Sequence, residues 1–175
     1  MLALALNGTQ AVWASRAPRA YAQPDVAVIA LNGSDWNAVG EAFAQSAHPA
    51  VLIGIDTPHL PLNRLRDAFT RLEDGADLVI GPAEDGSPYL IGIKAALPGF
   101  FDAMPHDHNH SMRALQQRVG EAGLRLTRLP GWYRINGYDD LHRLNEDLRV
   151  MPHDVAVHTR AFLNAGLDQA QVVGG

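Results

Sequence analysis

The chain has 175 residues, of which 47% are hydrophobic and 19% charged, so it is long enough for one globular domain with its own core. Its formal net charge is -5, which gives no electrostatic reason to expect binding to nucleic acid or to an anionic membrane. There is no cysteine, which excludes disulfides and thiolate metal sites and favours a cytoplasmic location, and no apolar run approaches the ~20 residues of a membrane helix.

Extended and helical patterns alternate along the chain. Short apolar runs bounded by turn residues predict strands at Leu2–Leu6, Val26–Leu31, Val51–Ile55, Asp77–Gly81, Tyr89–Ile93 and Leu124–Leu129. Apolar residues at helical spacing predict helices over 36–47, over 61–75, from Met112 to Gly123, along Leu141–Leu148, and from His153 to Asn164. This alternation predicts a three-layer α/β/α sandwich around a mostly parallel sheet, with residues 1–165 as one domain and residues 166–175 as a flexible tail.

Asp56 follows the run Val51–Ile55, in which four of five residues are β-branched or leucine. Such a run is typical of a strand buried on both faces of a parallel sheet, and ligands of open α/β sheets bind beyond the carboxyl ends of these strands. The carboxylate of Asp56 would suit a hard cation there, such as Mg²⁺ or Mn²⁺. A helix cap or a turn residue is the alternative interpretation of the same position.

Two further segments combine turn residues with polar groups. In GPAEDGSPYLIG, residues 81–92, Asp85 and Gly86 are either the turn of a hairpin, which is the favoured interpretation, or a contact to the hydroxyls of a ligand. In WYRINGYDD, residues 132–140, Asn136 is either a second metal or ligand contact or part of a plain Asn-Gly turn.

Residues 105–110, PHDHNH, place histidines at alternate positions: His106, His108 and His110. They could suggest zinc, but a solvated loop is favoured because no helical metal motif or second ligand cluster accompanies them. The chain also lacks a G-x-S-x-G elbow, a Walker-type phosphate loop, and a G-x-G-x-x-G after its first strand.

Taken together, GIDTPHL, GPAEDGSPYLIG and WYRINGYDDL resemble a bacterial glycosyltransferase-like family in the nucleotide-diphospho-sugar transferase (GT-A) superfamily, of the arsenosugar-biosynthesis type. The resemblance covers about Leu2 to Ala165. It implies a Rossmann-like GT-A fold and metal-dependent transfer from a nucleotide-activated sugar or a related phosphorylated donor. The expected partner is therefore a nucleotide sugar or another phosphorylated small molecule.

The resemblance also implies roles for single residues. Asp56 and Asn136 match the metal ligands, so Mg²⁺ or Mn²⁺ is the implied cofactor, and Asp85 matches a catalytic residue that orients the acceptor or acts as a base. The substrate-binding positions implied in the same way are His59, Gly86, Tyr89, Gly33 and Asp35.

The sequence departs from the family pattern at several points. Asn136 stands in place of an acidic ligand, Arg134 replaces another aspartate and puts a cation near the expected metal, and Ser87-Pro88 replaces Gly-Tyr. The family's opening phosphate-binding segment is also not recognisable. These departures motivate a second hypothesis, a non-catalytic GT-A-fold binding or assembly module that forms a homodimer or binds a partner chain at an exposed sheet edge. A zinc hydrolase built on the histidine segment is a third.

Overall fold

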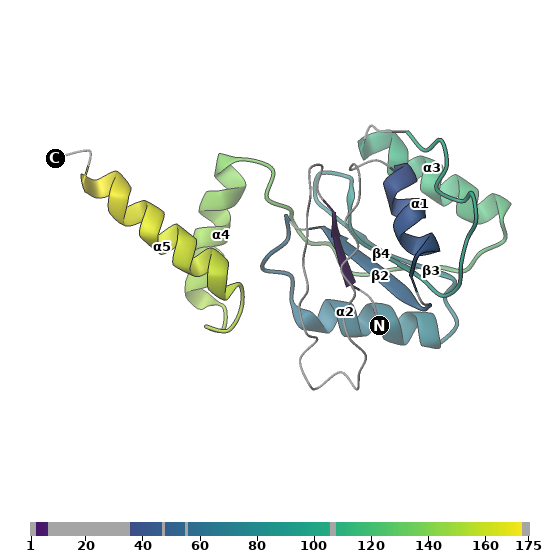
Figure 1. Cartoon of the computed structure of the whole chain (residues 1–175), viewed down its shortest axis with the longest axis horizontal. Coiled ribbons are helices and arrows are strands. Elements are labelled where there is room, and N and C mark those ends of the chain that lie inside the picture. Colours follow the sequence, from purple (N-terminus) through teal and green to yellow (C-terminus); the bar gives the residue numbers. More distant parts are fainter. Residues whose placement is uncertain (1–2, 7–35, 47, 55, 106–107, 173–175) are drawn as a thin grey trace.

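The computed structural model describes residues 3–6, 36–46, 48–54, 56–105 and 108–172, and these form a mixed α/β structure (Figure 1). Among the described residues, five strands make one sheet in the order β1-β2-β4-β3-β5. They are β1 (Ala3–Leu6), β2 (Ala50–Gly54), β3 (Leu78–Pro82), β4 (Pro88–Ile93) and β5 (Leu126–Arg128). The predicted strand Val26–Leu31 and the predicted site residues Gly33 and Asp35 lie outside the described residues.

The sheet is mixed because of β4. β1 pairs with β2 in parallel and β3 pairs with β5 in parallel, whereas β4 runs antiparallel to both of its neighbours, β2 and β3. The connection from β3 to β4 is too short for a crossover and forms a hairpin turn, so β4 must reverse direction. The prediction of a mostly parallel sheet did not include this reversal, although the hairpin itself was the favoured interpretation of residues 81–92.

Helices cover both faces of the sheet (Figure 1). On one face lie α1 (Trp36–Ala44) and α3 (His108–Glu121), and on the other lies α2 (Leu62–Glu73). The last two helices, α4 (Tyr138–Val150) and α5 (Val157–Val172), pack against each other to one side of the sheet. None of the described helices combines the length and the apolar character that crossing a membrane requires.

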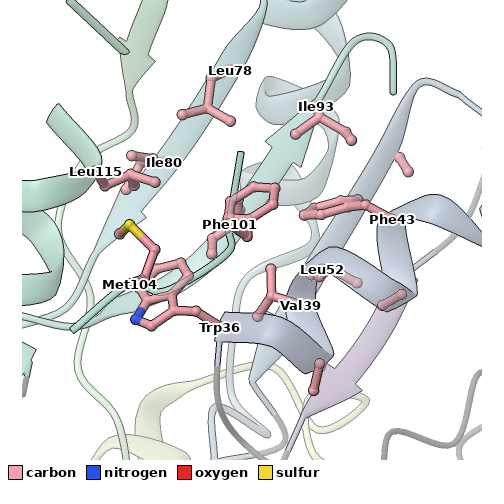
Figure 2. Packing of buried hydrophobic residues seen from close by; sticks show 14 of the residues in the cluster. Trp36, Val39, Phe43, Leu52, Leu78, Ile80, Ile93, Phe101, Met104 and Leu115 are labelled. Carbon is pink, nitrogen blue, oxygen red and sulfur yellow. The ribbon is translucent and has the colours of Figure 1, made fainter. Parts of the chain in front are cut away.

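An aromatic stack anchors the face that carries α1 and α3 (Figure 2). The Phe101 ring lies 5.4 Å from the ring of Phe43 and 6.1 Å from that of Trp36, centroid to centroid. Leu52, Leu78, Ile80, Ile91 and Ile93 supply the strand side of this core. Within each strand these residues alternate with residues that face α2, as the two-residue period of a strand requires.

The opposite face is closed by α2. Its buried side chains are Ala68, Phe69 and Leu72, which pack on the strand residues Val51, Val79 and Leu90. The sequence predicts Pro61 in the first turn of this helix. In the structure Pro61 instead precedes the helix in an extended conformation. Gly75 follows the helix with a φ of 113°, a conformation that favours glycine.

Two helices, α3 and α5, differ from the sequence predictions by several residues. α3 already begins at His108, so residues 108–110 lie in its first turn and not in the solvated loop that was favoured for 105–110. α5 begins at Val157 rather than His153 and continues to Val172, past its expected end near Asn164. A turn over 151–156, with Ala156 at a φ of 51°, occupies the start of the expected helix.

Candidate functional site

Polar side chains gather at the edge of the sheet where β2, β3 and β5 end. Asp56 follows β2, Asp85 lies in the turn that follows β3, and the segment 130–136 follows β5. Because these three strands run in the same direction, their carboxyl ends share one edge. Side chains that lie far apart in the sequence therefore meet there.

Hydrogen bonds fix the segment 130–136 between the hairpin and the end of β2. The Tyr89 hydroxyl donates to the carbonyl of Pro130 at 3.0 Å. The backbone bonds run from Trp132 N to Pro82 O (3.2 Å), from Glu84 N to Trp132 O (3.1 Å), and from Ile135 N to Asp56 O (2.8 Å). These hydrogen bonds fix the backbone of the segment and therefore the positions that the side chains of residues 134 and 136 can reach.

Arg134 lies at the centre of the cluster. Its Nε donates to Asp56 Oδ2 at 2.8 Å, and its Nη2 donates to the same oxygen. Its Nη1 donates to the Ser87 hydroxyl and lies 3.6 Å from Asp85 Oδ2. The exposed fractions of the side chains are 7% for Asp56, 17% for Arg134 and 27% for Asp85, so water screens these charges only in part.

Asp56 uses only one of its carboxylate oxygens within the described structure. Oδ2 accepts from Arg134, whereas Oδ1 is buried and has no hydrogen-bond partner among the described residues. Oδ1 lies against Gly54, where any side chain would clash with it. A buried acceptor without a partner is costly, so a donor that reached Oδ1 would stabilise it, but the side chains that cover it must move first.

Both oxygens of Asp85 accept hydrogen bonds. Oδ1 accepts from the backbone N–H of Ser87 at 2.9 Å and from the Ser87 hydroxyl, and Oδ2 accepts from Asn136 Nδ2 at 2.8 Å. Burial opposes ionisation of Asp85, but the bonds from Ser87 and Asn136 and the charge of Arg134 outweigh it and hold its pKa below the ordinary value. A carboxylate with a lowered pKa is a weak general base, so the arrangement suits a group that orients a ligand better than one that removes a proton.

The remaining described residues from the predicted substrate site lie away from solvent or are already engaged. His59 and Tyr89 are fully buried, so neither presents a surface to a ligand in this conformation. Gly86, in the turn with a φ of 82°, donates its backbone N–H to Ala83. Of the residues predicted from the sequence, the structure thus brings together Asp56, Asp85 and Asn136.

Sequence reasoning did not assign a role to Arg134 or Ser87. In the sequence both are only departures from the family pattern, yet in the structure Arg134 joins Asp56 to the hairpin and Ser87 bridges Arg134 and Asp85. The sequence does contain a reason to pair Arg134 with Asp56. A carboxylate that directly follows a buried strand needs a compensating charge, and Arg134 is a cation in a segment expected near Asp56.

The chain is similar to the crystal structure of a putative nucleotide-diphospho-sugar transferase from Desulfovibrio desulfuricans G20, with a TM-score of 0.66 and 26% sequence identity. The similarity covers 84% of this chain and 66% of that protein, so the chain spans less than two thirds of the relative's length. It supports the predicted placement of the fold in the GT-A-like superfamily.

The family assignment is more specific. A family model matches residues 3–108, which is more than half of the chain. The chain therefore belongs to the family described as uncharacterized proteins conserved in bacteria (DUF2064). No curated protein matches its sequence.

Proposed function

We propose that the protein is a nucleotide-diphospho-sugar transferase whose nucleotide-activated sugar binds at the edge formed by Asp56, Asp85, Arg134 and Asn136. The observation that carries the proposal is the convergence of these four side chains at the carboxyl ends of β2, β3 and β5. The structural likeness to a protein described in those terms supports the same class of ligand. The finer assignment to arsenosugar biosynthesis rests on the sequence resemblance alone.

The geometry suggests how the residues would divide the work. The unpaired Oδ1 of Asp56, which is buried in the structure, would accept a hydrogen bond from a hydroxyl of the ligand after a local movement that exposes it. Asp85 and Asn136, held together at 2.8 Å and more exposed than Asp56, would orient the sugar or the acceptor. Each role requires only hydrogen bonding, for which Asp85 and Asn136 are already fixed in place.

A second candidate is a binding module of the same fold that does not turn over its ligand. The lowered pKa of Asp85 favours it, because both carboxylate oxygens are committed to hydrogen bonds and no stronger base lies beside them in the described site. The two candidates differ in product formation and not in ligand binding.

Thermal melting with a panel of nucleotide sugars and free nucleotides tests the proposal. A ligand present at about 100 times its dissociation constant stabilises the folded state by about 2.7 kcal/mol, which corresponds to a rise of roughly 5–10 °C for a chain of this size. We expect such a rise with one nucleotide class, and a smaller rise for Asp85→Asn. The matched control, Asp67→Asn, removes an exposed carboxylate on α2 and should respond like the wild type.

Release of free nucleotide from the stabilising sugar donor, as the sugar is transferred to water or to an added panel of hydroxyl acceptors, then separates the two candidates. Release that falls about tenfold or more in Asp85→Asn supports the transferase. Binding without release supports the module. A panel in which no nucleotide or nucleotide sugar changes the melting temperature contradicts both.

A further inference from the structure

The guanidinium of Arg134 lies between the two carboxylates of the site. It donates two N–H groups to Asp56 Oδ2, and its third nitrogen lies 3.6 Å from Asp85 Oδ2. A cation that bridges two carboxylates in this way balances charge that would otherwise be buried without compensation. Arg134 therefore performs, within the chain, the electrostatic task that a bound divalent cation performs at many acidic sites.

The residues as arranged do not fit a divalent metal. Mg²⁺ requires oxygen ligands at about 2.0–2.1 Å in near-octahedral geometry, but Asp56 Oδ2 already accepts two N–H groups. Asn136 directs its amide nitrogen, not its oxygen, at Asp85. A metal beside these groups would also be repelled by the guanidinium. In the parts of the chain that the structure describes, no group of three acidic, histidine or cysteine side chains is arranged to hold a metal ion.

We propose that Arg134 is the resident cation of this site, and that the site binds its ligand without a divalent metal. The Mg²⁺ or Mn²⁺ cofactor predicted with Asp56 and Asn136 is replaced by a side chain. The class of ligand rests on the proposed function, whereas the charge arrangement rests only on Arg134 and its partners.

Titration of the protein alone with Mn²⁺, followed by electron paramagnetic resonance of the free ion, tests the charge arrangement without any nucleotide. We expect no saturable Mn²⁺ site in the wild type. Arg134→Gln removes the guanidinium and leaves the charges of the two carboxylates without compensation, so it should gain one saturable Mn²⁺ site per chain. Adding Asp56→Asn to that variant should abolish the gain.

Arg113→Gln is the matched control, because it removes an exposed arginine on α3, a helix that contributes no residue to the candidate site. This variant should gain no Mn²⁺ site. A saturable Mn²⁺ site in the wild type that Asp56→Asn abolishes would overturn the proposal. So would an Arg134→Gln variant that is folded and gains no Mn²⁺. If Arg134→Gln is unstable, its melting temperature should rise with Mn²⁺ while that of the wild type does not, and the absence of that rise would also count against the proposal.

The nucleotide panel adds an independent reading when each ligand is tested in EDTA and in Mn²⁺. Equal rises in melting temperature under both conditions support binding without metal. A rise that requires Mn²⁺ overturns this inference and leaves the proposed function standing. No rise under either condition contradicts the proposed function, while the Mn²⁺ titration still decides the role of Arg134.

Discussion

His59 is enclosed by aromatic rings. Its ring centroid lies 4.2 Å from that of Tyr133 and 5.3 Å from that of Trp132, and among the described residues neither ring nitrogen has a hydrogen-bond partner. Burial lowers its pKa to about 4, an effect that outweighs the opposing charge of Asp147. The imidazole is therefore neutral in the folded protein at neutral pH, and its protonation is coupled to unfolding.

This coupling predicts a pH dependence of stability. The pKa of His59 is about 4 when folded and about 6.5 when unfolded, so between these values the unfolded chain binds more protons and stability falls as the pH falls. From about pH 7.5 to about pH 5 the contribution of His59 is a loss of about 2 kcal/mol in the free energy of unfolding. Urea unfolding at the two pH values measures it, and His59→Leu should remove most of this loss.

His142→Gln is the control for that experiment, because His142 is an exposed histidine on α4. Its pH dependence should match that of the wild type. If His59→Leu loses as much stability between the two pH values as the wild type does, the acid sensitivity has another origin.

The site shows which single-residue assignments a sequence can support. Asp56 and Asp85 could be predicted to meet, because each follows a strand and the direction of the strands brings their ends to one edge. The burial of His59 could not be predicted from its neighbours in sequence, since Trp132 and Tyr133, which enclose it, come from a distant segment. The pairing of Arg134 depends on the same segment and on its hydrogen bonds to the hairpin.

At the scale of the elements, the β3–β4 hairpin depends on a glycine. The ring of Tyr89 in β4 crosses over Gly81 in β3, where a Cβ atom would clash with it. Tyr89 is fully buried, and its hydroxyl holds Pro130 at the start of the segment that carries Arg134. The close approach at Gly81 therefore supports both the hairpin and the site.

Gly81→Ala is expected to destabilise the protein by about 1–3 kcal/mol, because the added methyl group must displace the fully buried ring of Tyr89. Denaturant unfolding measures the change. Gly120→Ala makes the same substitution in α3, where a Cβ would meet no atom, and should stabilise by about 0.5–1 kcal/mol. Equal effects of the two substitutions would contradict the packing argument.

Most elements could be predicted from local pattern, and the differences have local causes. The residues of α2 that repeat at helical spacing, such as Phe69 and Leu72, are the ones that face the sheet. The alternation of strands and helices predicts parallel pairing for β4, which is wrong because the short turn around Asp85 reverses the chain. The sequence predicts the start of α3 at Met112 instead of His108, because the first turn of the helix contains histidines and other polar residues and so shows no apolar residues at helical spacing.

At the scale of the whole molecule, the buried apolar residues of the described part of the chain form three separate clusters. Two of them share the sheet, one on each face. The third consists of Leu144, Leu148 and Leu163, and joins α4 to α5 beside the sheet. Arg160 strengthens this third cluster, since its guanidinium donates to the carbonyls of Leu148, Met151, Pro152 and Val155 around the turn between the two helices.

This division predicts that α5 can open without the sheet. Leu144→Ala removes a fully buried side chain from the third cluster, where such a substitution typically costs about 2–5 kcal/mol. Because few apolar contacts join this cluster to the sheet, the cost should be confined to local opening of α5 and the end of α4. Hydrogen exchange of the backbone amides, resolved by peptide, should show faster exchange in 144–165 and unchanged exchange in β2, β3 and β4.

Leu72→Ala is the matched control, because it removes an equally buried leucine from the core between α2 and the sheet and should speed exchange in the strands instead. The bonds from Tyr133 to Asp147 and from Arg143 to Glu84 still connect α4 to the hairpin, so loss of protection in the strands of Leu144→Ala equal to that in α5 would mean that these bonds make the molecule one cooperative unit.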